Sequence, residues 1–198
     1  MEDAVSSRKV KIDRTTRETD ISLTLDPDSP GGGQVRTGLP FFDHLLTSMA
    51  FHGRFFLDVN AKGDLAVDPH HLVEDVGLVL GQAFTAVLAK TGQVKRFGHA
   101  VIPMDEALAQ VTIDVCGRPT LVWRVRLPQK QAGGFDLWLL REFFDGLTAQ
   151  ARISLHVDAR RGRNSHHIVE AAFKALGKSL HDSYSRADEE MSTKGQIG

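Results

Sequence analysis

Two short segments, each with paired histidines followed by a glutamate, offer the clearest chemistry in this sequence. HHLVED occupies residues 70–75 and is called the first motif; HHIVEA occupies residues 166–171 and is called the second motif. On a helix, the first histidine and the glutamate of a motif are four positions apart and share a face, whereas adjacent histidines diverge by about 100°. One histidine can therefore bind a metal ion together with the glutamate while its neighbour serves a second site.

The ligand types in the motifs favour a six-coordinate divalent metal ion over a structural zinc. Imidazole nitrogen and carboxylate oxygen without thiolate suit Mn²⁺ or Fe²⁺, and the single cysteine, Cys116, excludes a cysteine-based zinc finger. We expect Mn²⁺. His44 is a further candidate ligand beside the first motif, and Glu142 holds the corresponding position beside the second.

A different interpretation makes the histidines capping or solvent-exposed residues in a first helical turn. Asp68 and Asn164 stand just before the two motifs and are good capping residues. This interpretation is reasonable for one motif alone. Repetition of both histidines and the glutamate at the same offsets favours metal binding, because imidazole and carboxylate at helical spacing recur in divalent-metal sites.

The similarity between the two halves of the chain extends beyond the motifs. HHLVEDVGLVLGQAF and HHIVEAAFKALGKSL share His, His, Val, Glu, Leu and Gly, and HLLTSMAFHGRFFLDV aligns upstream with EFFDGLTAQARISLHV when a short gap is allowed. Such self-similarity indicates an internal duplication. We therefore expect a first half-repeat at residues 1–94, a second at residues 95–187 and a C-terminal tail at residues 188–198.

The same order of elements is expected in each half. Alternating apolar residues predict strands at residues 20–26 and 107–115. Helices are expected near residues 40–52 and 136–150, and a strand then precedes the helix that carries each motif. This order predicts an α+β fold with two half-domains, each a mostly antiparallel sheet with two helices packed on one face.

Bulk charge gives no indication of a nucleic-acid or membrane partner. The chain has 24 Lys and Arg residues against 25 Asp and Glu residues, so no global attraction to phosphate polymers or anionic lipid is expected. The first residues lack the apolar stretch of a secretion signal, and no apolar run of about 18 residues is evident. With a single cysteine, these features predict a cytoplasmic protein.

Five segments together resemble the imidazoleglycerol-phosphate dehydratase family of histidine biosynthesis. They are TGLPFFDHLL, HGRFFLDV, GDLAVDPHHLVEDVGLVLGQA, RFGHAVIPMDEALAQVTIDVCGRP and RNSHHIVEAAFKALGKSL, and the similarity extends from about residue 8 to residue 194. The resemblance implies a hydro-lyase that converts imidazole glycerol phosphate to imidazole acetol phosphate and water through a metal-stabilised imidazolate. It also implies two Mn²⁺ ions per active site, and a homo-oligomer of 24 subunits whose active sites are shared between chains.

The resemblance also assigns roles to individual residues. The implied metal ligands are His44, His70, His71, Glu74, His166, His167 and Glu170, with Glu142 as a further candidate. The implied catalytic carboxylates are Glu18 and Asp105, together with the ligands Glu74 and Glu170. The groups implied to hold the substrate, mainly its phosphate, are Glu18, Arg96, Arg118, Lys174, Ser192 and Lys194, the last two in a tail that would order over the bound phosphate.

The sequence departs from the family pattern at Glu142, where histidine is common. A carboxylate still suits Mn²⁺, and the alternative is a glutamate on the helix surface. Two other functions are open from the residues alone. One is a structural or storage assembly in which metal at both motifs only joins subunits. The other is a metallohydrolase, suggested faintly by the LDPDSP segment at residues 25–30.

Overall fold

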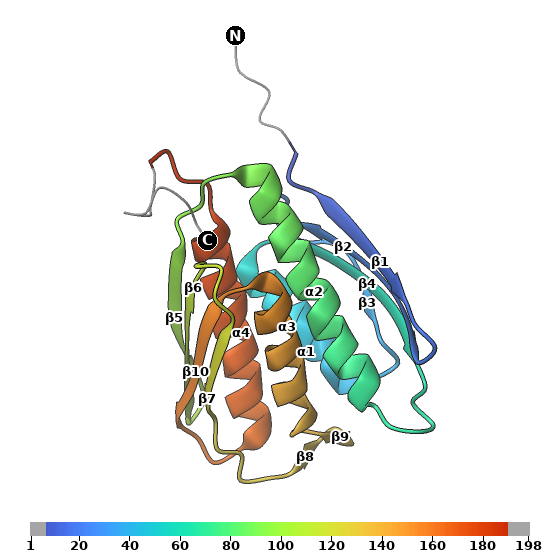
Figure 1. The fold of residues 1–198 in the computed structure, drawn as a ribbon. Helices are drawn as coiled ribbons and strands as arrows, with labels where there is room; N and C mark the ends of the chain where they lie inside the picture. The colour runs from blue at the N-terminus through green and yellow to red at the C-terminus, as the bar shows by residue number, and fades with distance from the viewer. Residues whose placement is uncertain (1–6, 190–198) are drawn as a thin grey trace.

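The computed structural model describes residues 7–189 and places four helices between two four-stranded sheets (Figure 1). In the first sheet the strand order is β1-β2-β4-β3, and in the second it is β5-β6-β10-β7. The last pair of each sheet, β4 with β3 and β10 with β7, is parallel, and the other pairs are antiparallel. The repeated topology confirms the predicted α+β fold with mostly antiparallel sheets.

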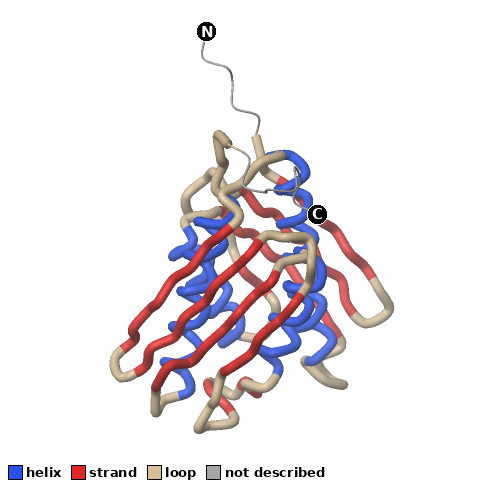
Figure 2. The backbone as a smooth tube through the Cα atoms, turned by 60° about the vertical axis from the view of Figure 1, so that its left-hand side comes forward, coloured by secondary structure: helices blue, strands red, loops and turns tan. Residues whose placement is uncertain are grey.

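The bounds of the strands are as follows. The first sheet contains β1 (Val10–Thr15), β2 (Thr19–Asp26), β3 (Val35–Arg36) and β4 (Phe56–Gly63). The second sheet contains β5 (Phe97–Met104), β6 (Ala107–Asp114), β7 (Thr120–Arg124) and β10 (Ser154–Arg161), and a small hairpin is formed by β8 (Gln131–Ala132) and β9 (Phe135–Asp136). Figure 2 shows the strands of one sheet running side by side in front of the helices.

The four helices pair across the two halves of the chain. They are α1 (Pro40–Gly53), α2 (His70–Thr91), α3 (Leu139–Ala151) and α4 (Ser165–Tyr184). Helix α2 covers β1 and β2, and α4 covers β5 and β6. Between the sheets, α1 packs on α4 and α2 packs on α3. The buried apolar residues accordingly form one continuous core that draws on both halves.

Local sequence explains most of these elements. Strands β2 and β6 alternate buried and partly exposed residues along their length, as the alternating pattern predicts. Pro40 stands in the first turn of α1, where its missing N–H group costs nothing. Helix α3 begins three residues later than expected, because Asp136 belongs to the β8–β9 hairpin and accepts a hydrogen bond from Gln131 (2.7 Å).

Helix α2 is long and apolar enough, by length and composition only, to cross a membrane. In this structure 61% of its most apolar window is buried inside the protein, between the first sheet and α3. The core helix of a soluble protein passes the same test of length and composition. The apolar character of α2 is therefore explained by its central position in the fold.

Glycines at matching positions let the paired helices approach closely. Gly81 in α2 and Gly177 in α4 occupy equivalent positions, each eleven residues after the first histidine of its motif. A Cβ atom on Gly177 would lie 2.0 Å from the carbonyl oxygen of Met49 in α1, and one on Gly81 would lie 2.6 Å from that of Leu147 in α3. The shared glycine is therefore a packing requirement of both helix pairs.

Gly177→Ala is expected to destabilise the protein although alanine is the better helix former. The propensity gain is about 1 kcal/mol, whereas overpacking against backbone costs about 1–3 kcal/mol and more for so short a contact. Chemical denaturation should show a lower free energy of unfolding, while Lys178→Ala, on the exposed face of the same helix, should change it little. An alanine variant as stable as the parent would contradict the packing role.

Candidate metal centre

The second motif forms a compact cluster of three potential metal ligands. The Oε2 atom of Glu170 lies 3.0 Å from Nε2 of His166 and 3.1 Å from Nε2 of His44. The three ligand atoms lie within 4.8 Å of one another, and they form the one such cluster found among residues 7–189. Imidazole nitrogen and carboxylate oxygen at this separation can bind a divalent metal ion.

His44 therefore lies beside the second motif, and the expectation that it lies beside the first was wrong. The reason is the pairing of helices across the halves, which sets α1 against α4 and not against α2. The same pairing places Glu142, half-buried on α3, on the helix that packs along α2. Glu142 is thus associated with the helix of the first motif, and the expected partners of His44 and Glu142 are exchanged.

The first motif is more open than the second. In the first motif, Nε2 of His70 lies 3.5 Å from Oε2 of Glu74, whose side chain is 43% exposed. The indole ring of Trp138, just before α3, lies 5.7 Å from the His70 ring between centroids. Trp138 is 53% exposed and was not singled out from the sequence, where a lone tryptophan in the first turn of an expected helix carries no distinctive signal. The corresponding neighbour of His166 is Phe41, at 5.1 Å.

The second histidine of each motif is held by a carboxylate at its Nδ1 atom. Nδ1 of His71 lies 3.1 Å from Asp64, and Nδ1 of His167 lies 2.8 Å from Glu106. A histidine that donates from Nδ1 leaves Nε2 as a lone-pair donor, which is the usual support for a metal-binding imidazole. Sequence reasoning missed both carboxylates, because they stand in loops outside the repeated segments.

Hydrogen bonds control the charge of these groups. The contact with Asp64 raises the pKa of His71. Hydrogen bonds from His167 and from the backbone N–H groups of residues 163 and 164 lower the pKa of Glu106 to about 2. Burial raises the pKa of Glu170, but hydrogen bonds from Lys174, His44 and His166 outweigh burial and hold that pKa at about 2. Glu106 and Glu170 are therefore anionic at neutral pH.

Both candidate acid–base carboxylates approach the motifs from hairpin turns. Glu18 stands in the β1–β2 turn, with Oε2 4.0 Å from Nδ1 of His71. Asp105 stands in the β5–β6 turn, with Oδ2 3.6 Å from Nε2 of His167. The two turns are equivalent in the duplicated topology. Each motif therefore has an exposed carboxylate beside its second histidine.

The candidate phosphate-binding cations are divided between two ends of the molecule. Lys174 lies at the second motif, with Nζ 2.9 Å from Oε1 of Glu170. Arg96 forms an ion pair with Asp114 (2.7 Å), and its N–H donates to the carbonyl of Ser183, 13 residues after Glu170 on the same helix. At 1.5 Å per residue, Arg96 is thus about 20 Å from the second motif.

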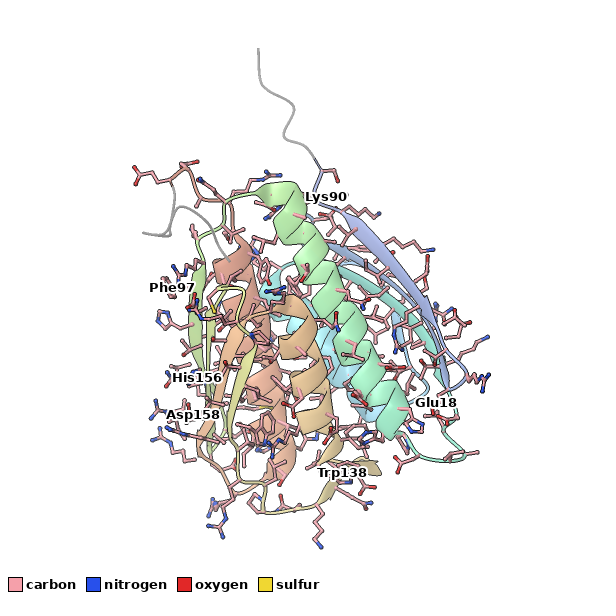
Figure 3. All side chains as sticks on the ribbon, viewed as in Figure 1. Glu18, Lys90, Phe97, Trp138, His156 and Asp158 are labelled. Atoms are coloured by element: carbon pink, nitrogen blue, oxygen red, sulfur yellow. The ribbon has the colours of Figure 1, made fainter. Side chains whose placement is uncertain are left out.

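Figure 3 labels residues at the two ends of the molecule. Glu18 and Trp138 lie toward one end of the molecule, while Lys90, near the C-terminal end of α2, lies toward the other. Phe97, which follows Arg96, also lies toward that other end. Arg118 is exposed in the loop after β6. The tail candidates Ser192 and Lys194 lie outside the described residues.

Comparisons with known proteins agree on one family. The family model described as imidazoleglycerol-phosphate dehydratase matches residues 37–180, more than half of the chain. The chain belongs to the imidazoleglycerol-phosphate dehydratase family. A member from Acetivibrio thermocellus is 47% identical over 193 residues, which cover 96% of this chain and 99% of the relative. One from Acidithiobacillus ferrooxidans is 44% identical over 176 residues, covering 89% and 88%.

Solved structures of the same family have the same fold. The enzyme from Pyrococcus furiosus superposes with a TM-score of 0.84 at 38% identity, covering 94% of this chain and all of that one. The enzyme from Staphylococcus aureus gives 0.82 at 34% identity, covering 90% and 99%. The resemblance drawn from the motifs is confirmed. The chain is accordingly a hydro-lyase of histidine biosynthesis, in a family of metal-dependent dehydratases.

The depressed pKa of Glu106 predicts a stability effect at acid pH. Because the folded-state pKa is about 2 and the usual value is 4.5, the stabilisation is complete above about pH 4.5 and is lost as the pH falls toward 2. The difference in melting temperature between the metal-free parent and Glu106→Gln should therefore be constant near neutrality and shrink below pH 4.5.

A matched control is Asp145→Asn, because Asp145 is half exposed and pairs only with Arg141 in the described residues (3.5 Å). An exposed pair of this kind contributes little to stability. Its melting difference from the parent should be small at every pH. A Glu106→Gln difference that stays constant down to pH 2 would contradict the depressed pKa.

Proposed function

We propose that this chain converts imidazole glycerol phosphate to imidazole acetol phosphate and water, using two Mn²⁺ ions per active site. The observation that carries the proposal is the cluster of His44, His166 and Glu170, combined with membership of the dehydratase family. The first motif offers a second set of nitrogen and carboxylate donors on α2. Two similar ligand sets agree with two metal ions of one kind.

The donor chemistry fits Mn²⁺. The proposed ligands are the imidazoles of His44, His70, His71, His166 and His167 and the carboxylates of Glu74, Glu142 and Glu170. They offer nitrogen and oxygen without sulfur, which suits a six-coordinate ion. When bound, the metal ions would act as Lewis acids that stabilise negative charge on the substrate's imidazole ring.

The chain's own carboxylates would move the protons. Dehydration breaks one carbon–hydrogen bond and one carbon–oxygen bond, so a base must take the proton and an acid must protonate the departing hydroxyl group. Glu18 and Asp105 are each about 4 Å from the second histidine of a motif, and both are more than half exposed. Each can therefore reach a substrate held at the motifs, with Oε2 or Oδ2 as the proton-carrying atom.

Phosphate binding would require more than one chain. Lys174 is close to the second motif, but Arg96 is about 20 Å away along α4. We infer that Arg96 and Arg118 of a neighbouring copy complete the phosphate site, with Ser192 and Lys194 closing over it. A groove that combines apolar residues (Trp123, Val125, Leu127, Leu137 and Trp138) with the polar residues Gln129, Lys130, Asp136 and Arg141 supports association between copies.

The proposed assembly is a homo-oligomer of 24 subunits in the cytoplasm, without nucleic-acid or membrane partners. The balanced charge of 24 basic and 25 acidic residues supports the absence of a polyanionic partner. A direct test loads the purified protein with Mn²⁺ and follows formation of imidazole acetol phosphate. Turnover supports the proposal. Metal-replete protein that assembles but turns over no substrate would favour a structural role for the metal.

Replacing the two motif glutamates should weaken metal binding, assembly and activity together. Glu170→Gln removes an anionic ligand that faces two imidazoles, so we expect a loss of Mn²⁺ affinity of about tenfold or more. Glu74→Gln should also weaken binding, at the more open first motif. Titration calorimetry and sedimentation would measure the two effects. Normal metal-free assembly of either variant would show that metal does not join the subunits.

Glu142 provides a separate test of the exchanged helix partners. If Glu142 ligates metal beside the first motif, Glu142→Gln should weaken binding of one Mn²⁺ and leave the ion at His44 and Glu170 unaffected. The free Mn²⁺ signal in electron paramagnetic resonance would resolve the two classes of site. Asp145→Asn, on the same helix, is the matched control. Unchanged binding of both ions would identify Glu142 as a non-ligating glutamate of α3.

A further inference from the structure

We propose that Asp75 is a positioning residue that anchors the backbone of Glu18, and thereby sets where the Glu18 carboxylate stands beside the first motif. The inference rests on the proposed function, because it presumes that Glu18 moves a proton of the substrate. Asp75 follows Glu74 on α2, and about 100° of rotation separates the two side chains. Glu74 therefore faces His70. Asp75 faces the first sheet instead, at the end of the β1–β2 hairpin that carries the turn.

Asp75 is a buried carboxylate with two donors from that hairpin. Asp75 is only 7% exposed. The hydroxyl of Thr19 donates a buried hydrogen bond to Oδ2, and the guanidinium of Arg14 forms an ion pair with the same oxygen. A buried charge persists in a fold when it is paired and hydrogen-bonded. Both donors come from the strands that flank Glu18.

The turn between these strands is itself closely hydrogen-bonded. Oγ1 of Thr16 accepts from the N–H groups of Glu18 (3.1 Å) and Thr19 (3.0 Å). The N–H of Asp64 donates to the carbonyl of Glu18 (3.1 Å), and the carboxylate of Asp64 holds His71. A continuous chain of contacts thus runs from Asp75 through Thr19 and Glu18 to His71. The backbone of Glu18 is fixed on both sides, while its carboxylate stays exposed.

In the second half, different residues hold the equivalent hairpin turn. There the position of Asp75 is taken by Ala171, so α4 offers no buried carboxylate to its hairpin. The β5–β6 turn is held instead by Glu106, which accepts from two backbone N–H groups (2.8 Å each) before the motif and contacts His167. A buried carboxylate at this helix position is therefore found in the first half alone, and the hairpin that Asp75 anchors is the one that carries Glu18.

The test removes the Thr19 hydroxyl and asks whether the effect passes through Glu18. Thr19→Val keeps the side-chain shape but loses the hydroxyl contacts with Asp75 and with Oγ1 of Thr16 (3.2 Å), and Thr19→Ser keeps the hydroxyl. Displacement of a catalytic group by about 1 Å can cost up to a hundredfold in rate. We expect Thr19→Val to lower kcat at least about tenfold, with little change in Mn²⁺ affinity, and Thr19→Ser to restore most of the rate.

A double-mutant cycle makes the inference specific. In a Glu18→Gln background, Thr19→Val should lower kcat little further, because the group that it positions is already gone. Independent, multiplicative losses would overturn the inference, and so would a Thr19→Ser variant as slow as Thr19→Val. Asp75→Asn, which keeps an acceptor for Thr19 but loses the charge that Arg14 pairs with, should give an intermediate loss and the same non-additivity.

Hydrogen exchange separates this inference from the proposed function. The amides of Thr16, Glu18 and Thr19 should exchange faster in Thr19→Val than in the parent, and this measurement needs no substrate. Unchanged exchange would overturn the anchoring role even in an active enzyme. A parent protein without turnover contradicts the dehydratase proposal. Turnover that survives Glu18→Gln intact leaves the dehydratase standing and overturns the positioning role.

Discussion

The close pairing of helices across the two halves is the constraint on which the site depends. Glycines at equivalent positions allow α4 to contact the backbone of α1 and α2 to contact that of α3. Because the helices pair across the halves, His44 from the first half lies beside the second motif. Neither half alone could assemble the three-ligand cluster. The duplication therefore supplies two copies of each part, and the cross-packing of the helices decides which parts meet.

Carboxylates outside the ligand set account for much of the remaining order. Asp64 and Glu106 each occupy the Nδ1 side of a motif histidine. This arrangement orients the imidazole and leaves Nε2 as the atom available to a metal ion. Glu106 also accepts from the backbone N–H groups of residues 163 and 164, just before α4, so one carboxylate both orders the entry to the helix and orients a candidate ligand. The contacts that order this part of the fold are thus the ones that would orient the metal ligands of the proposed function.

Much of the fold could be predicted from the sequence because its signals are local. Alternating apolar residues indicated β2 and β6, and the repeat implied two similar sheets. Capping residues indicated the starts of α2 and α4, where Asp68 and Asn164 accept hydrogen bonds from the backbone N–H groups of His70 and His166. The partner of His44 could not be predicted in this way. Helix pairing is a long-range property, and the natural assumption that adjacent helices pair within a half was wrong. Asp64, Asp75 and Trp138 were missed because their contacts are also long-range.

The surroundings of Glu170 explain how the cluster can accept a metal ion and still leave room for a substrate. Oε1 is occupied by Lys174 at 2.9 Å, and Oε2 faces His44 and His166. The lysine therefore both offsets the buried negative charge and reserves one oxygen, so that Glu170 presents a single oxygen to the cluster. A six-coordinate ion with two imidazoles and one such oxygen keeps further positions for other ligands. Under the proposed function, substrate nitrogen and donors from a neighbouring chain would occupy these positions, which would complete the set of ligands that one chain offers.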